Sequence, residues 1–266
     1  MKSVAVITGA SSGMGRLFAK TVTAHGNFDE IWVIARRADR LEELKNELSI
    51  PVKTVCLDLS ERESYARYGE MLKSEKPVVQ WLIHCSGFGK FQATMDVPLE
   101  INLNMLDLNC AATMALDQLT VPYMPAGSHI VNVASVAAYQ PIPYINVYGA
   151  TKAFVLHYSR ALDRELRPRG IAVTAVCPFW TKTEFFNRAV DKDDAAVVKK
   201  YVAMHTPEQI VRRAWRDAER GKDVSKFGFI ARLQVILAKL LPHWFVMWYW
   251  MRQQKLNKES TEKSAG

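Results

Sequence analysis

The sequence predicts an α/β fold in which a doubly wound parallel sheet carries helices on both faces. Six short apolar runs, rich in β-branched residues, alternate with five segments of helical periodicity along the 266 residues. Such runs are typical of strands buried on both faces, and their alternation with helices indicates repeated strand–helix–strand units. The expected strands are Ser3–Thr8, Glu30–Ala35, Val52–Leu57, Val78–His84, Ser128–Ala134 and Gly170–Val176.

The expected helices follow from the 3.6-residue spacing of apolar side chains. Leu41, Leu44 and Leu48 recur at i, i+3 and i+7, with charged residues between them. No internal repeat, low-complexity tract or Pro/Ser-rich linker divides the chain, so we expect one domain at 1–228, followed by an apolar, basic helical extension at 229–266. The expected helices are Gly13–His25, Asp39–Leu48, Glu61–Glu75, Leu99–Val121 and Val147–Leu166.

Composition excludes several classes of protein. With 49% apolar and 23% charged residues, the chain is neither collagen-like nor disordered. Its four cysteines stand at least 25 residues apart without a CxxC pair. They predict buried thiols in a reducing compartment, not a disulfide framework or a metal site. The N-terminal apolar run is too short for a signal peptide, so we expect a cytoplasmic protein.

The positive charge is concentrated near the C-terminus. Of the net charge of +8, residues 220–266 contribute nine basic and three acidic groups, whereas residues 1–219 are nearly neutral, with 26 basic and 24 acidic groups. A nucleic-acid-binding body would need basic patches on the main domain, so we expect no nucleic-acid partner.

The first expected strand ends in a glycine-rich turn that leads directly into a helix. Glycines at such a turn let the backbone approach a pyrophosphate, whose charge then lies at the helix N-terminus. The strand before it and the helix after it favour a dinucleotide site over a plain tight turn. The expected cofactor contacts in this turn are Gly9, Ser11, Ser12, Gly13, Met14 and Gly15.

The spacing Thr-Gly-x-x-x-Gly-x-Gly at residues 8–15 resembles that of the short-chain dehydrogenase/reductase family. The resemblance extends over about residues 1–183 and implies a Rossmann-type sheet of six to seven strands in the order 3-2-1-4-5-6-7. It also implies a homodimer or homotetramer, and places Asp58 and Leu59 beside the adenine of the cofactor.

The end of the second strand distinguishes NADP(H) from NAD(H). An acidic side chain there would hydrogen-bond the ribose 2′-hydroxyl of NAD and repel a 2′-phosphate. This chain has Ala35 followed by Arg36 and Arg37. Guanidinium groups form paired hydrogen bonds with phosphate, so we expect NADP(H), with Arg36 favoured by position and Arg37 assisting. The alternative is a solvated basic turn in an enzyme that uses NAD(H).

Tyr148 and Lys152 lie four residues apart on an expected helix, so both project from one face. A cation near a phenol favours the phenolate and lowers the phenol pKa from its ordinary value near 10. Such a tyrosine can exchange a proton with a substrate oxygen while hydride moves to or from nicotinamide. Ser135 follows the fifth strand, at the sheet edge where ligands bind, and precedes Tyr148 by the family's usual 13 residues.

The resemblance implies roles for the remaining residues. Ser135 hydrogen-bonds the substrate oxygen, Lys152 also holds the nicotinamide ribose, and Asn109 places a water in the proton relay. A mid-helix asparagine that only satisfies a backbone group is the alternative for Asn109. Four positions depart from the family pattern, since Phe179 replaces a glycine, and His84, Cys85 and Ser86 stand where many members have Asn-Asn-Ala. We expect His84 to be a packed histidine at the strand end and not a catalyst. Further cofactor contacts are implied at Gly87, Tyr148, Lys152, Pro178, Thr181 and Thr183.

The chain beyond Thr183 carries no motif. We expect a substrate loop at about 184–206, a helix at Pro207–Arg220, a last strand within Asp223–Phe229, and two apolar helices at Ile230–Leu241 and His243–Met251. Neither apolar helix reaches the roughly 18–20 apolar residues of a membrane span. The two helices are expected to pack on the substrate pocket or a second subunit. The alternative is peripheral contact of 229–258 with an anionic membrane.

These observations predict an NADP(H)-dependent oxidoreductase that interconverts a carbonyl group and a secondary alcohol. The apolar extension resembles that of a subgroup containing steroid and fatty-acyl reductases, which implies a hydrophobic ketone as the small-molecule substrate. The alternative is a non-catalytic NADP(H)-binding sensor or scaffold that docks through the extension. An intact Ser–Tyr–Lys set argues against that alternative, because a protein that only binds the cofactor has no need of it.

Overall fold

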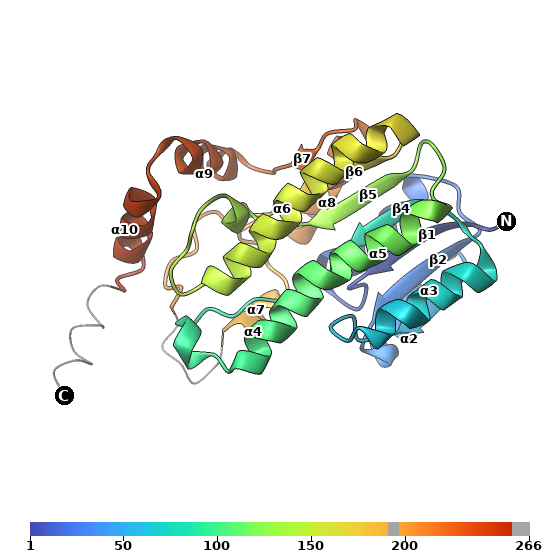
Figure 1. Ribbon diagram of the computed structural model, residues 1–266, viewed down its shortest axis with the longest axis horizontal. Helices are drawn as coiled ribbons and strands as arrows, with labels where there is room; N and C mark the ends of the chain where they lie inside the picture. Colours follow the sequence, from blue (N-terminus) through green and yellow to red (C-terminus); the bar gives the residue numbers. More distant parts are fainter. Residues whose placement is uncertain (191–196, 257–266) are drawn as a thin grey trace.

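The computed structural model describes residues 1–190 and 197–256, which contain a seven-stranded parallel sheet (Figure 1). The strand order β3-β2-β1-β4-β5-β6-β7 is the predicted one. Because every neighbouring pair is parallel, all strands end at the same edge of the sheet, where open α/β sheets bind ligands. The strands are β1 (Ser3–Thr8), β2 (Glu30–Ala35), β3 (Val52–Cys56), β4 (Val78–His84), β5 (His129–Val133), β6 (Ala172–Val176) and β7 (Val224–Ser225).

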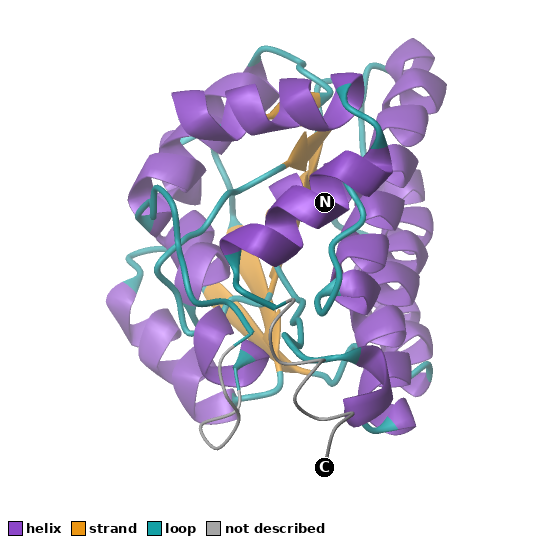
Figure 2. Ribbon diagram, turned by 90° about the vertical axis from the view of Figure 1, so that its left-hand side faces the viewer, coloured by secondary structure: helices purple, strands orange, loops and turns teal. Residues whose placement is uncertain are grey.

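Helices cover both faces of the sheet (Figure 2). Successive strand residues point to opposite faces, so β1 divides its apolar side chains between two cores. Val4 and Val6 join the core beneath α3, α5 and α6, whereas Ala5 and Ile7 join the core beneath α1, α2 and α8. The α-helices are α1 (Gly13–Thr21), α2 (Ala38–Glu47), α3 (Glu63–Glu75), α4 (Leu99–Leu106), α5 (Ala112–Thr120), α6 (Asn146–Leu166), α7 (Phe185–Ala189), α8 (Pro207–Glu219), α9 (Phe229–Leu240) and α10 (His243–Gln253).

The helix expected at Leu99–Val121 contains a π-helical segment, Asp107–Ala111, between α4 and α5. In this wider helical turn Leu108 and Asn109 are buried. π-Helical segments are frequent at functional sites. The 3.6-residue spacing of apolar side chains could not predict the π-helical segment, because that segment extends over a single turn.

The remaining differences from the predicted elements lie at their ends. The first helix stops at Thr21 and continues as one 3₁₀ turn, Val22–Ala24. The strand expected within Asp223–Phe229 comprises only Val224–Ser225, since the chain leaves the sheet edge and enters α9 through Gly228, whose φ is +90°. β3 ends one residue earlier than expected, β5 is one residue shorter at each end, and β6 begins two residues later than expected.

Two helices, α9 and α10, follow the sheet and lie together at one end of the molecule (Figure 1). On α9, Ala231 and Val235 pack against Val136, which follows β5. On α10, Nε1 of Trp250 donates to the carbonyl of Pro143 at 3.1 Å. Within 1–190 and 197–256 no helix has the length and apolar character needed to cross a membrane. Residues 191–196 of the expected substrate loop and 257–266 of the extension lie outside the described residues.

Candidate active site

The glycine-rich turn after β1 approaches the neighbouring backbone so closely that side chains would not fit. Gly9 has a φ of +66°, and a Cβ there would lie 2.7 Å from backbone atoms of Cys85 and Ser86, just beyond β4. A Cβ on Gly15 would collide with the carbonyl oxygen of Gly9. The turn therefore presents bare backbone at the N-terminus of α1, which fits a pyrophosphate group.

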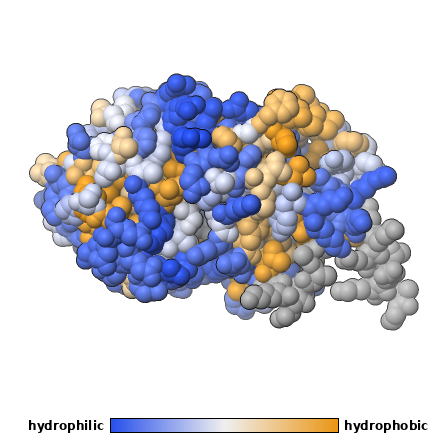
Figure 3. Space-filling model, turned by 180° about the vertical axis from the view of Figure 1, so that it is seen from behind, coloured by the Kyte–Doolittle hydropathy of each residue, from blue (hydrophilic) through white to orange (hydrophobic). Residues whose placement is uncertain are grey.

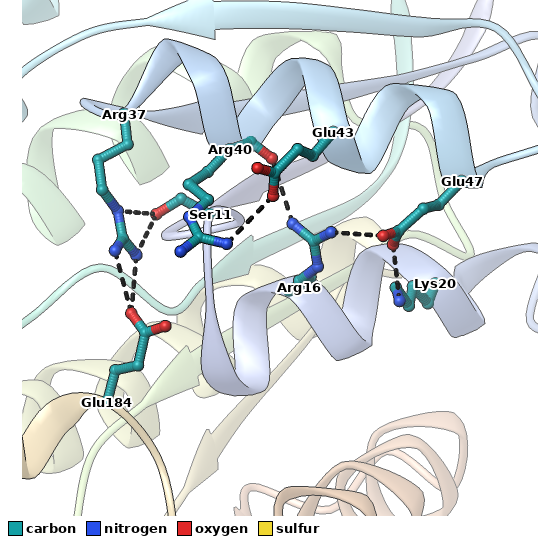
Figure 4. Close-up of polar contacts among 8 residues, drawn as sticks. All are labelled: Ser11, Arg16, Lys20, Arg37, Arg40, Glu43, Glu47 and Glu184. Atoms are coloured by element: carbon teal, nitrogen blue, oxygen red, sulfur yellow. Dashed lines mark hydrogen bonds and ion pairs between the residues drawn. The ribbon is translucent and has the colours of Figure 1, made fainter.

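Two arginines at the end of β2 lie beside this turn. Arg37 donates from Nε and Nη2 to Ser11 Oγ, at 3.3 and 3.1 Å, and from Nη1 and Nη2 to Glu184 Oε2, both at 3.0 Å (Figure 4). Arg36 instead donates from Nη1 to Asp58 Oδ2 at 3.3 Å. Both guanidinium groups are about half exposed. Position in the sequence favoured Arg36, but Arg37 is the arginine that contacts the glycine-rich turn.

Asp58 and Leu59 follow β3 at the same edge of the sheet. Asp58 Oδ1 accepts hydrogen bonds from the backbone N–H and the hydroxyl of Ser60, at 3.0 and 2.7 Å. Burial acts to raise the pKa of Asp58, but the hydrogen bonds from Ser60 and the charge of Arg36 outweigh it and lower the pKa. Leu59 is buried beside it. Asp58 is thus an ionised carboxylate held in one orientation next to Arg36.

Ser135, Tyr148 and Lys152 come together beyond the end of β5. The Oγ of Ser135 accepts a hydrogen bond from the backbone N–H of Ala137 at 3.1 Å, which fixes the position of that oxygen. Tyr148 and Lys152 lie one turn apart on α6, with Nζ of the lysine 5.8 Å from the centre of the tyrosine ring. The same Nζ donates to the carbonyl of Val133 at 2.7 Å. All three side chains line one cavity.

The pKa values of Tyr148 and Lys152 are both shifted by burial. Burial raises the pKa of Tyr148 to about 12, although the Ser135 hydroxyl acts in the opposite direction. Burial lowers the pKa of Lys152 from 10.5 to about 8. The expected lowering of the Tyr148 pKa by Lys152 is therefore wrong for this structure, because burial dominates and the ammonium bonds the Val133 carbonyl. At neutral pH Tyr148 is a phenol that can donate a proton.

Asn109, in the π-helical segment, uses its side-chain amide to connect the loop after β4 with α6. Its Oδ1 accepts from the N–H of Phe88 at 3.0 Å, and its Nδ2 donates to the Phe88 carbonyl and to Thr151 Oγ1, both at 2.9 Å. Thr151 in turn donates to the backbone carbonyl of Tyr148 at 2.8 Å. A Cβ on Gly87 would lie 2.8 Å from Asn109 Oδ1. The amide thus positions backbone on both sides of the site, and its expected part in a water relay stays a prediction.

The other expected contacts surround the same cavity. A Cβ on Gly13 would lie 3.4 Å from the side chain of Thr183, so the loop after β6 reaches the glycine-rich turn. Five of the predicted cofactor contacts line the cavity together with the Ser–Tyr–Lys set, namely Met14, Gly87, Pro178, Thr181 and Thr183.

The departures from the family pattern at residues 179 and 84 have structural explanations. Phe179 packs against the cluster of Val136, Ala231 and Val235, so the side chain that replaces glycine helps to hold α9 on the body. His84 is buried, with Nε2 3.0 Å from Oδ1 of Asp117. This contact agrees with the packed, structural histidine predicted from the sequence.

The cavity has a volume of about 360 Å³ and mainly apolar walls. An aromatic cluster surrounds Tyr148, with ring centres of Phe91 and Phe185 at 6.4 and 5.4 Å from that of the tyrosine. Sequence reasoning missed this cluster, although aromatic residues are frequent between 179 and 186. The wall formed by α9, α10 and the turn between them includes Ile230, Leu233, Leu237, Leu241, Phe245, Val246, Tyr249 and Trp250.

Comparison with known proteins agrees with this geometry. A family model described as short chain dehydrogenase matches residues 3–194. The chain belongs to this family. It is therefore an oxidoreductase that acts between alcohol and carbonyl groups, as its relatives' names, reductases and dehydrogenases, also state. This finding replaces the alternative of a sensor without catalytic activity.

Several relatives resemble most of the chain. Over 202 residues it is 33% identical to sulfoacetaldehyde reductase 2 of Chromohalobacter salexigens, which covers 74% of this chain and 79% of the relative. Over 261 residues it is 25% identical to human very-long-chain 3-oxoacyl-CoA reductase, and the match covers 94% of this chain and 79% of the relative. A solved short-chain dehydrogenase from Sphingobium yanoikuyae, in complex with NADPH, is 28% identical with a TM-score of 0.74, covering 88% and 92%.

Proposed function

We propose that this enzyme is an NADP(H)-dependent oxidoreductase that interconverts a ketone and a secondary alcohol on an apolar substrate. The observation that carries the proposal is the mainly apolar cavity into which Ser135, Tyr148 and Lys152 project. Apolar walls with a few convergent polar groups are typical of small-molecule sites, where the polar groups orient the reacting atoms.

The side chains have distinct roles in this proposal. Nicotinamide, when bound, supplies or accepts the hydride. In the reductive direction Tyr148, a phenol at neutral pH, donates the proton to the substrate oxygen. Ser135, with its oxygen fixed by the Ala137 N–H, donates a hydrogen bond to the same oxygen and orients the carbonyl. Lys152 holds the nicotinamide ribose, and Asn109 keeps α6 and the loop after β4 in place.

We assign NADP(H) as the cofactor on the two arginines after β2. Arg37 places a half-exposed guanidinium group on the glycine-rich turn, Arg36 places another beside Asp58, and no acidic residue occupies the end of β2. Guanidinium groups suit the 2′-phosphate that distinguishes NADP from NAD. The NADPH complex of the Sphingobium relative supports this assignment.

An apolar ketone suits the walls of the cavity. One wall is formed by leucine, isoleucine and aromatic side chains of α9 and α10, which offer dispersion contacts and few hydrogen bonds. A fatty-acyl chain or a steroid skeleton would pack against such a wall. The name of the human relative, a very-long-chain 3-oxoacyl-CoA reductase, supports the fatty-acyl class.

We also propose that the enzyme is a homodimer formed through α4 and α5. Leu99, Leu103 and Leu106 recur at i, i+4 and i+7 and are 67%, 49% and 43% exposed, with Met114 further along the same helical run. Leu103→Glu should give a monomer in sedimentation velocity. An unaltered molecular mass would reject this interface.

The reaction is tested by following NADPH consumption against long-chain 3-oxoacyl thioesters, ketosteroids and small polar ketones. We expect turnover with an apolar ketone, lost in Tyr148→Phe, while NADPH binding measured by fluorescence titration is retained. Turnover of Tyr148→Phe at more than a few per cent of the wild-type rate would reject the assigned role. A preference for the small polar ketones would reject the apolar substrate class.

A further inference from the structure

The outer side of α9 is an exposed apolar stripe. Phe229, Leu233, Ile236 and Leu240 recur at i, i+4, i+7 and i+11, so they lie along one side of the helix. Their exposed fractions are 78%, 43%, 53% and 75%. The opposite side of α9 is buried against the body of the protein. So much exposed apolar surface on one helix marks an interaction site.

α10 continues this surface with tryptophans. Trp244 and Trp248 lie one turn apart and are 67% and 44% exposed. Arg252 follows one turn later, with its guanidinium 5.4 Å from the centre of the Trp248 ring. Figure 3 shows apolar residues gathered toward the right-hand end of the molecule, the end that α9 and α10 form. The apolar face is defined as Phe229, Leu233, Ile236, Leu240, Trp244 and Trp248.

All formal charges within the segment that carries the apolar face are positive. From residue 224 to residue 256 the sequence has five Lys or Arg residues and no Asp or Glu. Arg232 and Lys239 are seven residues apart and flank the stripe on α9, and both are exposed. Apolar helices with tryptophan and basic residues at their borders are typical of proteins that lie in an anionic membrane interface.

The apolar face also adjoins the rim of the cavity. Leu233, Leu237 and Tyr249 line the cavity and are at the same time 43%, 44% and 56% exposed. We propose that α9 and α10 dock in the interface of an anionic lipid bilayer, with the apolar face inserted and the cavity rim turned toward the lipid. Docking depends only on the apolar face and its charges. Delivery of an apolar substrate from the bilayer to the cavity rests on the proposed function.

A second copy of the chain fits the apolar face less well than a bilayer does. In a symmetric contact each copy would present the same surface, so basic residues would face basic residues without an acidic partner on either helix pair. Anionic headgroups supply the missing negative charge, and the acyl boundary accepts the exposed tryptophan and leucine side chains. The observations therefore favour lipid as the occupant.

The test uses the full chain with vesicles of phosphatidylcholine alone or of phosphatidylcholine with phosphatidylglycerol. We expect the protein to float with the anionic vesicles and far less with the neutral ones. Leu240→Gln combined with Trp248→Gln should weaken partitioning more than about tenfold, because each removes a large apolar side chain from the interface. Arg232→Gln combined with Lys239→Gln should abolish the preference for anionic lipid. Met95→Gln, at an apolar residue 92% exposed elsewhere, should bind like the wild type.

The variants must keep their fold and their chemistry for the test to count. Their thermal midpoints and NADPH binding should match those of the wild type, since none of the altered residues lines the cavity. Docking is overturned by a wild-type protein that stays unbound with anionic vesicles, or by a Leu240/Trp248 variant that floats as well as the wild type. It is equally overturned if that variant changes the oligomeric state without vesicles. Flotation without turnover on any ketone would reject the proposed function and leave docking intact.

Discussion

The guanidinium of Arg37 hydrogen-bonds both Ser11 in the glycine-rich turn and Glu184 in the loop after β6 (Figure 4). It therefore links two segments 173 residues apart, at a point where the proposal places the 2′-phosphate of NADP(H). A carboxylate and a phosphate compete for the same guanidinium hydrogens. Glu184 is thus expected to oppose NADP(H) binding and to leave NAD(H) binding unaffected.

Removing the Glu184 charge should tighten NADPH binding. Exposed ion pairs contribute up to about 1 kcal/mol, so Glu184→Gln should lower the Kd of NADPH about two- to fivefold. Arg37→Ala should raise that Kd at least about tenfold, because it removes a charge-assisted pair of hydrogen bonds. Fluorescence titration with NADPH and NADH measures both. Arg212→Ala, at an exposed arginine on α8, is the control and should leave both affinities unaltered. Changes in NADH affinity as large as those in NADPH affinity would contradict the assigned competition.

The pH dependence of the two reaction directions should differ. Because burial raises the pKa of Tyr148 to about 12, the phenol needed for ketone reduction is present throughout the neutral range. Alcohol oxidation needs the phenolate, so its kcat/KM should increase with pH. Reduction should decline above pH 8, where Lys152, with a pKa lowered by burial to about 8, loses its charge. The measurement is the initial rate in both directions from neutral pH to above pH 8. An oxidation rate that falls as pH rises would refute the role assigned to Tyr148.

Lys152 should also make stability depend on pH. Its pKa is about 8 in the folded protein and 10.5 in the unfolded chain, so between these values the unfolded chain binds more protons. The free energy of unfolding therefore gains a contribution that rises with pH in this window, by at most about 1.4 kcal/mol per pH unit. Urea unfolding of Lys152→Met should lack this contribution. Lys45→Met, on an exposed side of α2, should retain it, and identical slopes in all three proteins would contradict the assignment.

Gly89 leaves space that the ring of Tyr148 occupies. A Cβ on Gly89 would lie 2.8 Å from Cδ2 of Tyr148 and 3.0 Å from Cζ of Phe185. Gly89→Ala should therefore displace the ring and lower kcat at least about tenfold, with NADPH affinity unaltered. Gly149→Ala is the matched control beside Tyr148, because its Cβ would make an ordinary 3.6 Å contact with the Ala137 carbonyl. Steady-state kinetics that show the same loss in both variants would disprove this account.

Local signals in the sequence determined the architecture and the set of candidate catalytic residues. The apolar runs, the helical spacing and the glycine-rich turn are each visible within a few residues of sequence. They do not give the strand order by themselves, which was predicted from the family that the glycine-rich turn resembles. Ser135, Tyr148 and Lys152 were found because one strand end and one helix turn bring them together. Phe179 was recognised only as a departure, since the α9 residues of the cluster it packs against, Ala231 and Val235, lie far along the chain.

Tertiary structure alone decided which charges meet and how far each group is buried. Only the folded chain brings Arg37, and not Arg36, within hydrogen-bond distance of Ser11, and the direction of the Tyr148 pKa shift follows from burial of that side chain. The position of α9 and α10 was likewise decided by the tertiary structure, because an apolar helix can pack on any apolar surface that it reaches. Periodicity shows that such a helix has an apolar side, and only the folded chain shows that a second apolar side stays exposed.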